Sequence, residues 1–419
     1  MSAIAISFSL ASLFIWIYLL CFRGQFWQTR QHLEALSAPP PDPHVLECPP
    51  ITVVIPARNE ADVLPTTVRS LVAQRYPGNL DIIVVDDHST DETATVAQQA
   101  AEEIGAQLDF PRTLRILHAN PLPVGWTGKL WALEQGTQYA LNQTPESGFI
   151  LLTDADIEHD PDNLYRLVTQ AQHDHLDLVS IMVRLRCQSV WEKLLIPAFV
   201  FFFQKLYPFS WVNNPQKRTA AAAGGCALIR PAALRRIGGI AAIRQALIDD
   251  CALANAVKWT VQERNVNLSA QSFSRSLHPP IPSTHPIWLG LSSLTCSLRP
   301  YPDLKTIWDM VARTAYTQLH YSPLLLLGTL IGMTWVYLVP PLSAIAGIVT
   351  GQWALFAVGL STWLLMAIAY APILQFYRVP LAVAACLPAI AFLYTLMTLD
   401  SALRHWQGRG GAWKGRVYQ

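Results

Sequence analysis

The sequence predicts an α/β domain with a mostly parallel sheet and apolar helices at both ends of the chain. Two observations support this. Short continuous apolar runs alternate with helical patterns in the first half of the sequence, which is typical of a parallel sheet covered on both faces. Of the 419 residues, 52% are hydrophobic and only 14% are charged, against roughly 25% charged in an ordinary soluble domain. The low charged fraction indicates that part of the chain lies in a bilayer.

The first element is an uncharged apolar run from Ile4 to Phe22. Its length is close to the ~20 residues that a helix needs to cross a ~30 Å hydrocarbon core. No basic residue precedes it and no small-residue cleavage site follows it, so we interpret residues 1–22 as a membrane anchor and not as a cleaved signal peptide. Arg23 and Arg30 follow immediately, and the positive-inside rule predicts that the chain is cytoplasmic from residue 23 onward.

The segment 23–50 contains a Pro-rich linker to a globular domain that we place at 51–320. Seven scattered cysteines form no C-x-x-C pair, and we expect them to be reduced thiols, which agrees with a cytoplasmic domain. The net charge is only +1. Because nucleic-acid binding needs a concentrated basic face, no nucleic-acid partner is expected.

Three short apolar runs of the globular domain are each followed by polar residues. Because the carboxyl ends of parallel strands meet at one edge of a sheet, where ligands bind, we expect these polar residues to form one site. The runs and the residues that follow them are 51–55 with Pro56 and Glu60, 82–85 with Asp86 and Asp87, and 149–152 with Asp154 and Asp156.

The third of these clusters is a candidate metal site. Asp154 and Asp156 are separated only by Ala155, so both carboxylates can approach one hard cation. Mg²⁺ or Mn²⁺ is normally bound by one or two carboxylates together with substrate phosphates and water. An Asp-x-Asp pattern by itself occurs in many loops, and its place after a buried strand is what favours a site for metal and diphosphate.

The other two clusters are candidate nucleoside contacts. Asp86 and Asp87 can accept hydrogen bonds from a base or a ribose, or cap the following helix, which Ser89 or Asp91 can do equally well. Glu60 can reach the nucleoside or simply favour the first turn of its helix.

Three later motifs add candidate residues. Lys129 follows a Gly-Trp-Thr-Gly stretch and can bind a diphosphate or remain a solvated loop residue; the spacing is not that of a P-loop. Gly224 and Gly225 predict a turn that lets substrate approach the backbone and leads into a strand. Asp249 and Asp250 begin a helix. If Asp249 caps that helix, Asp250 is available as a general base toward an acceptor hydroxyl.

Apolar stretches in the region 321–402 predict membrane helices, followed by a basic tail at 403–419. Three crossings from the cytoplasm would leave the tail outside, whereas its Arg and Lys residues favour the inside. Either the break at Pro340-Pro341 splits the first stretch into a re-entrant pair, or one stretch lies in the interface, and both alternatives stay open. The stretches are 322–349, 353–376 and 380–400.

A shorter apolar piece runs from Leu194 to Phe203 between Lys193 and Lys205. It is too short to span a bilayer. It is either a buried core helix or an interfacial helix within 190–211, beside the entry of a lipid substrate.

Four ordered motifs resemble those of the large inverting family 2 glycosyltransferases, which have the GT-A fold. The membrane layout, with the stretches 310–319 and 406–415, is similar to that of the hopene-associated glycosyltransferases, relatives of ceramide glucosyltransferase. The four motifs are Val54-Ile-Pro-Ala-Arg-Asn-Glu60, Val84-Val-Asp-Asp-His-Ser-Thr-Asp91, Leu152-Thr-Asp-Ala-Asp156 and Ile248-Asp-Asp250.

The resemblance implies a hexosyltransferase of the inner membrane, which transfers one sugar from a nucleotide-sugar, a UDP-sugar, to a lipid hydroxyl with inversion, in hopanoid or other glycolipid synthesis. It assigns the Mg²⁺ or Mn²⁺ ion to Asp154 and Asp156 and the catalytic base to Asp250. The expected donor contacts are Pro56, Glu60, Asp87, Lys129, Asp154 and Arg313.

One departure from the family concerns the acceptor side. A Gln-x-x-Arg-Trp motif precedes the last membrane helices in processive members and in ceramide glucosyltransferases, whereas residues 310–314 keep Arg313 but lack the Gln and Trp. This weighs against a processive polysaccharide synthase. A polyprenyl-phosphate sugar transferase stays open, with Arg299, Lys305 and Arg313 as its basic cluster. A catalytically silent membrane scaffold would not need the four carboxylates.

Overall fold

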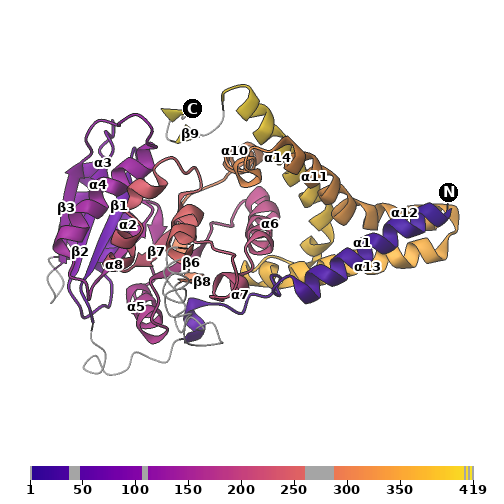
Figure 1. Ribbon diagram of the computed structural model, residues 1–419, viewed down its shortest axis with the longest axis horizontal. Helices are drawn as coiled ribbons and strands as arrows, with labels where there is room; N and C mark the ends of the chain where they lie inside the picture. Colours follow the sequence, from indigo (N-terminus) through magenta and orange to yellow (C-terminus); the bar gives the residue numbers. More distant parts are fainter. Residues whose placement is uncertain are drawn as a thin grey trace, which may run out of the picture. The chain divides into compact units, whose positions relative to one another are not determined.

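The computed structural model describes residues 2–36, 48–105, 112–259, 287–409, 412–413 and 416–417. They form two compact units, coloured along the chain in Figure 1. The sheet unit consists of Gln31–Leu185 and Trp211–Arg299. The helical unit consists of Met1–Arg30, Arg186–Ser210 and Pro300–Gln419. The candidate interfacial segment and the residues from Pro300 to position 320 therefore belong with the terminal helices.

An eight-stranded sheet organises the sheet unit, in the order β3-β2-β1-β4-β7-β6-β8-β5. Strands β1, β2, β3 and β4 pair in parallel, as do β6 and β8, while β7 runs antiparallel to β4 and β6 and β5 runs antiparallel to β8. The mostly parallel α/β sheet predicted from the sequence is confirmed. The strands are β1 Ile51–Ala57, β2 Leu80–Asp86, β3 Arg112–His118, β4 Phe149–Thr153, β5 Ile157–Glu158, β6 Leu178–Arg184, β7 Cys226–Ile229 and β8 Ile287–Ser297.

Register explains why the polar clusters meet at one edge. Ala57 lies opposite Asp86, and Asp86 lies opposite His118. Every residue of β1 and β4 is buried, as expected for central parallel strands covered on both faces. The carboxyl ends of β1, β2 and β4 therefore point their following loops to the same edge of the sheet.

Helices cover this sheet, and α4 packs closest to its centre. A Cβ atom at Gly136 of α4 would lie 2.4 Å from Val54 Cγ1 and 2.8 Å from Val85 Cγ2, so this helix approaches β1 and β2 at a distance that only glycine permits. The covering elements are η1 Leu33–Leu36, α2 Leu64–Val72, α3 Thr93–Gly105, α4 Gly128–Gln143, α5 Asn163–His173, α8 Pro231–Arg236, η2 Ile240–Ile243 and a helix at 249–259.

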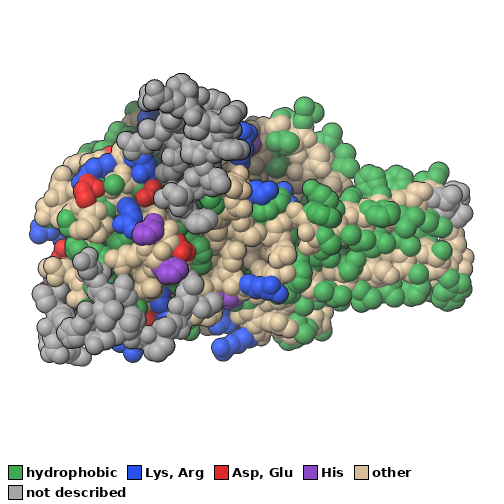
Figure 2. Space-filling model, turned by 60° about the horizontal axis from the view of Figure 1, so that its bottom comes forward, with side chains coloured by type: hydrophobic (Ala, Val, Ile, Leu, Met, Phe, Trp, Pro, Cys, Tyr) green, Lys and Arg blue, Asp and Glu red, His purple; other side chains and the backbone are tan. Residues whose placement is uncertain are grey.

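The helical unit contains the apolar helices expected at both ends of the chain. Among the described residues, five helices are long and apolar enough to cross a membrane: Ile4–Phe22, Val190–Val212, Pro323–Thr350, Trp353–Phe376 and Leu381–Trp406. Hydrophobic side chains cover the surface around α1, α12 and α13 (Figure 2). The elements are α1 Ser2–Phe22, α6 Val190–Leu206, α10 Leu304–Ala312, η3 Thr317–Leu319, α11 Pro323–Met333, the π-helical turn η4 Thr334–Leu338, α12 Val339–Thr350, α13 Trp353–Phe376, η5 Leu381–Cys386 and α14 Leu387–Trp406, with the short α7 Phe209–Val212 at the boundary.

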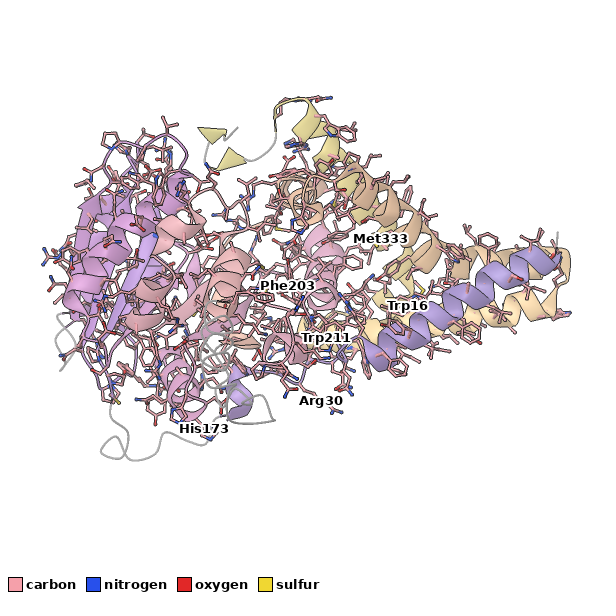
Figure 3. The ribbon with its side chains drawn as sticks, viewed as in Figure 1. Trp16, Arg30, His173, Phe203, Trp211 and Met333 are labelled. Atoms are coloured by element: carbon pink, nitrogen blue, oxygen red, sulfur yellow. The ribbon has the colours of Figure 1, made fainter. Side chains whose placement is uncertain are left out.

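Hydrogen bonds join α1 to the α11–α12 segment of this bundle. Trp16, labelled in Figure 3, donates from Nε1 to the carbonyl of Val336 at 2.9 Å, within the π-helical turn. The hydroxyl of Ser9 on α1 donates to that of Ser343 on α12 at 2.5 Å. An unpaired polar group in hydrocarbon costs roughly several kcal/mol. Separation of the helices would leave these groups unpaired, so the contacts fix α1 against the α11–α12 segment.

Candidate functional site

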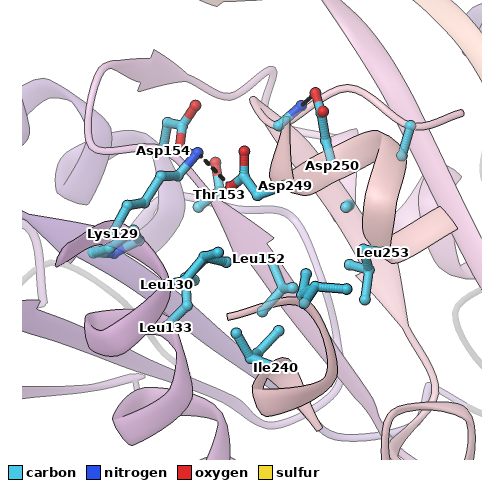
Figure 4. A pocket seen from close by; sticks show the side chains of 15 residues that line it. Lys129, Leu130, Leu133, Leu152, Thr153, Asp154, Ile240, Asp249, Asp250 and Leu253 are labelled. Carbon is cyan, nitrogen blue, oxygen red and sulfur yellow. Dashed lines mark hydrogen bonds and ion pairs between the residues drawn. The ribbon is translucent and has the colours of Figure 1, made fainter. Parts of the chain in front are cut away.

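A pocket at the carboxyl edge of the sheet brings together residues from β1, α4, β4, the turn before β7, η2 and the helix at 249–259. Figure 4 shows its two sides. Lys129, Asp154, Asp249 and Asp250 lie at one end, and apolar side chains such as Leu152 lie at the other. The pocket therefore presents charged groups at its mouth above an apolar floor.

The β4 end carries the predicted metal ligands on a turn that is held below by a buried polar network. The Thr153 hydroxyl donates to the carbonyl of Gly225 at 2.7 Å and lies 3.1 Å from His159 Nε2. Asn163 Nδ2 lies 3.0 Å from His159 Nδ1. Since the hydroxyl proton is used on Gly225, the imidazole must donate from Nε2 and accept at Nδ1. Burial lowers the pKa of His159 to about 3, which agrees with this neutral form.

Two further contacts fix the rest of the turn. Thr67 donates from its hydroxyl to the carbonyl of Ala155 at 2.8 Å. The amide of Leu298 donates to the carbonyl of Asp156 at 2.7 Å. The two carboxylates thus extend from a backbone that cannot easily move, which is the preorganisation that a metal site needs.

Lys129 stands at the first turn of α4, between two carboxylates. Its Nζ lies 2.8 Å from Asp154 Oδ1 and 3.0 Å from Asp249 Oδ2. Burial alone would lower the pKa of Lys129, but the negative charges of Asp154 and Asp249 outweigh it and hold that pKa above its usual value. Lys129 is therefore a charged residue of the site and not a solvated loop lysine.

Arg299, at the end of β8, holds the second carboxylate of the turn. Its Nε donates to Asp156 Oδ2 at 2.8 Å, and its Nη2 lies 3.4 Å from Glu60 Oε1. The sequence suggested Arg299 only as part of a basic cluster for a phosphate acceptor. Asp156 and Arg299 are 143 positions apart in the chain, so no local motif relates them.

Asp250 receives two backbone amides. Oδ2 accepts from Gly224 at 2.9 Å and Oδ1 accepts from Cys251 at 2.7 Å. Burial raises the pKa of Asp250 to about 7, and the neighbouring charge of Asp249 acts in the same direction, against the opposing effect of Lys129. A carboxylate with a pKa near neutrality is matched to general-base work.

Gly224 marks the point on which these groups converge. A Cβ atom at this glycine would lie 3.5 Å from Lys129 Nζ and 3.6 Å from both Asp154 Oδ2 and Asp250 Oδ2. The absence of a side chain leaves room for a ligand atom beside all three groups. This fits the substrate access that the glycine pair suggested in the sequence.

At the end of β2, Asp87 and Asp86 have different surroundings. Asp87 Oδ2 lies 3.7 Å from Arg58 Nη1, and its Oδ1 lies 3.2 Å from His88 Nδ1. Asp86 accepts from the Ser89 amide at 3.1 Å, a local turn contact. The cap of α3 is Asp91, whose Oδ1 accepts from the Thr93 amide at 3.1 Å. Asp86 holds the turn after β2, and Asp87 stays the candidate for a nucleoside.

The structure thus brings most of the predicted residues together within the sheet unit. Pro56 and Lys129 line the same pocket as Asp154 and Asp250, and Glu60 and Asp156 share Arg299. Arg313 belongs to the helical unit, where it follows α10.

Asp154 and Asp156 fit a Mg²⁺ or Mn²⁺ ion of the kind that relies on substrate phosphates and water for its remaining ligands. Burial raises the pKa of Asp154, and the negative charge of Asp156 acts in the same direction, against the opposing effect of Lys129. Across the part of the chain that the structure describes, no group of three or more His, Cys, Asp or Glu residues forms a closed metal cage. Two carboxylates would leave the remaining coordination positions of such an ion to phosphate oxygens and water.

The carboxylates and cations lie at the carboxyl ends of parallel strands, the edge at which open α/β sheets bind their ligands. Residues 52–238 match the family described as Glycosyl transferase family 2. These residues are a family 2 glycosyltransferase domain, and the family and GT-A fold class predicted from the sequence are confirmed. The narrower likeness to hopene-associated and ceramide enzymes stays a prediction.

Three similar proteins illustrate the match. The undecaprenyl-phosphate 4-deoxy-4-formamido-L-arabinose transferase of Enterobacter sp. (strain 638) is 30% identical over 143 residues, 34% of this chain and 38% of that protein. The 4,4'-diaponeurosporenoate glycosyltransferase of Staphylococcus haemolyticus (strain JCSC1435) is 32% identical over 133 residues, 31% of each chain. The mannosyltransferase PcManGT from Pyrobaculum calidifontis, solved in complex with GDP-Man and Mn²⁺, is 18% identical, with 96% of this chain and 99% of that chain covered and a TM-score of 0.49. The aligned regions span less than two fifths of the two curated relatives.

Proposed function

We propose that this protein is a membrane glycosyltransferase that transfers one sugar from a nucleotide-sugar, a UDP-sugar, to the hydroxyl of a lipid, with inversion at the sugar carbon. The observation that supports this most directly is that one pocket contains two kinds of group. Lys129 beside Asp154 suits the diphosphate, and Asp250 is a carboxylate suited to act as a base. A single displacement needs those two functions on opposite sides of the transferred sugar.

The donor side of the proposal rests on charge. Lys129 and Arg299 are cations beside the Asp154–Asp156 turn, and cationic side chains bind diphosphates through charge-assisted hydrogen bonds. Asp87 accepts from the base or ribose at the end of β2. A Mg²⁺ or Mn²⁺ ion held by Asp154 and Asp156 supplies neutralisation of the negative charge on the leaving diphosphate.

On the acceptor side, Asp250 removes the proton of the attacking hydroxyl. Its two amide partners fix the carboxylate in place, and the apolar floor of the pocket limits water. The apolar helices of the helical unit give a lipid acceptor a membrane environment. The catalytic domain is on the cytoplasmic side in this proposal, because Arg23 and Arg30 follow the first apolar helix.

The test uses the full chain in detergent, with UDP and Mn²⁺ binding measured by calorimetry and sugar transfer to membrane lipid extracts measured with labelled UDP-sugars. We expect metal-dependent UDP binding, loss of that binding in Asp156→Ala, and loss of turnover with retained UDP binding in Asp250→Asn. Absence of metal-dependent binding would point instead to a silent scaffold.

A polyprenyl phosphate is the second candidate acceptor. It is supported by the 30% identical relative, which is named as an undecaprenyl-phosphate sugar transferase. The basic cluster expected for it is partly engaged elsewhere, since Arg299 pairs with Asp156 and Lys305 pairs with Asp309 at 2.6 Å.

Asp250→Asn separates the two acceptors. A hydroxyl needs a base, so the substitution should lower transfer by about 10²- to 10⁴-fold. A phosphate acceptor is already ionised at neutral pH, so transfer to it should survive the substitution. The products also differ, because a sugar joined through a phosphodiester is released by mild acid and a simple glycoside is not.

A further inference from the structure

Each carboxylate of the Asp154–Asp156 turn is bound by a side-chain cation from a different part of the fold. Lys129 of α4 holds Asp154 at 2.8 Å, and Arg299 at the end of β8 holds Asp156, also at 2.8 Å. Two single positive charges on two carboxylates equal the charge of one divalent cation. The protein's own cations thus neutralise the same oxygens that a metal would bind.

Of the two cations, Arg299 is built to move. Its side chain is 40% exposed, whereas those of Asp156 and Glu60, which it joins, are 9% and 11% exposed. The backbone beside it is fixed, because the Leu298 amide donates to the Asp156 carbonyl and Ser297 pairs with Ile157. The guanidinium can therefore swing through the open side of the site while its Cα stays next to Asp156.

A divalent cation on Asp156 and a guanidinium on the same carboxylate repel each other, so the two compete for it. A diphosphate offers Arg299 a better partner once it leaves, since the planar guanidinium forms two parallel hydrogen bonds with phosphate oxygens. Glu60 Oε1 lies 3.4 Å from Arg299 Nη2. The Arg299 side chain would pivot about this contact as it leaves Asp156.

We propose that Arg299 is a donor-binding residue that competes with the divalent cation for Asp156 and binds the donor diphosphate when the cation takes that carboxylate. The inference rests on the proposed nucleotide-sugar donor. It links the two ligands, because metal binding releases the residue that the diphosphate needs, and diphosphate binding removes the competitor of the metal.

The experiment measures two affinities in the full chain in detergent: Mn²⁺ alone, and UDP at saturating Mn²⁺. In Arg299→Gln the competitor and the phosphate contact both disappear. We expect Mn²⁺ alone to bind several-fold more tightly, and UDP to bind about 10- to 100-fold more weakly, as for a lost charge-assisted hydrogen bond. Arg299→Lys keeps the charge that competes for Asp156 but loses the planar guanidinium that makes two parallel hydrogen bonds. Mn²⁺ affinity should therefore stay near that of the parent chain while UDP affinity falls.

Arg75→Gln is the matched control. Arg75 also makes a two-pronged ion pair, with Asp162 at 2.6 and 2.7 Å, on an exposed part of the sheet unit, and its loss should change neither affinity. Weaker binding of both Mn²⁺ and UDP in Arg299→Gln would mean that Arg299 has a merely structural role. Unchanged affinities would mean that Arg299 takes no part in binding either ligand. Either result overturns the inference. If the parent chain binds neither Mn²⁺ nor UDP, the proposed function itself has failed.

Discussion

At the residue scale, the proposed base Asp250 is expected to set the pH dependence of transfer. Burial raises its pKa to about 7, and Asp249 acts in the same direction. The base form is the ionised one, so the fraction of active enzyme grows as the pH rises through that value. We expect kcat/KM to fall roughly tenfold per pH unit below about pH 7 and to level off above it, measured with the full chain and a labelled donor.

The control for this profile is donor binding. UDP affinity at saturating Mn²⁺ should change less across pH 6 to 8 than kcat/KM does, because the base acts on the acceptor. A profile that is flat between pH 5.5 and 8 would remove Asp250 from the role of base.

Lys129 tunes that base as well as binding Asp154. Its positive charge opposes the rise in the pKa of Asp250. In Lys129→Met this opposing effect is lost, so we expect the midpoint of the pH profile to move above that of the parent chain, in addition to a lower kcat/KM. Measurement of the profile at saturating donor distinguishes this shift from weaker donor binding. An unchanged midpoint would show that Lys129 acts on the donor alone.

At the element scale, the contact of α4 with the sheet explains how Lys129 reaches the strand ends. Gly136 lets α4 lie directly on β1 and β2, and a Cβ there would meet Val54 and Val85 at 2.4 and 2.8 Å. We expect Gly136→Ala to lower the free energy of unfolding by about 1–3 kcal/mol, as overpacking of a core does. It should also reduce kcat/KM, because α4 must move away from β1 and take Lys129 with it.

Gly328→Ala is the matched control for this change. Gly328 is also a helical glycine, but no heavy atom lies within 4 Å of its added Cβ. Thermal unfolding of both variants, followed by circular dichroism, should show a loss at position 136 and no loss at position 328. Equal melting temperatures for the two variants would contradict the close packing of α4.

Local sequence patterns predicted some strands and side-chain pairs of the sheet unit and not others. Strands β1, β2 and β4 follow from continuous apolar runs, and the glycine pair predicted the turn into β7 at Cys226. The antiparallel direction of β7 between β4 and β6 could not be predicted, because strand pairing depends on contacts distant in sequence. For the same reason Asp154 and Asp156 could be named as a pair, whereas the Arg299 partner of Asp156 and the Asp249 partner of Lys129 could not.

At the scale of the whole molecule, chain connections restrict which apolar helices can cross a membrane. Helix α6 has enough apolar length by composition, but Leu185 before it and Trp211 after it both belong to the sheet unit. A single crossing would put the two ends of one folded domain on opposite sides. Helix α6 therefore stays on one side, as a core or interfacial helix.

Helix α10 must lie on the same side as the sheet unit. It begins at Leu304, five positions after Arg299, and five residues extend at most about 18 Å, less than the ~30 Å hydrocarbon core. The end of α14 is polar and bound to α10, since Arg404 contacts Asp309 and Trp308 donates to Asp400. The chain leaves α10 and returns to it at the end of α14. The number of membrane crossings between these two points is therefore even.

Three apolar segments lie between those two points, and only two of them can cross. The stretch Pro323–Thr350, which ends in α12, is joined to α13 by two residues. Helices α12 and α13 pack along each other and along α1, so we expect these two stretches to be the crossing hairpin. We therefore expect α14 to lie along the interface, which is one of the two alternatives that the sequence left open. The basic tail after position 403 would then be on the same side of the membrane as the catalytic domain, in agreement with the positive-inside rule.

Protease protection in sealed vesicles tests this arrangement, with one epitope tag before Met1 and another after Gln419. In vesicles that expose the sheet unit, we expect protease to remove the C-terminal tag together with the sheet unit and to leave the N-terminal tag intact. Detergent should then make the N-terminal tag cleavable, which controls for vesicle sealing. A protected C-terminal tag would mean that α14 crosses the membrane, and its polar contacts with α10 could then not exist in the same molecule.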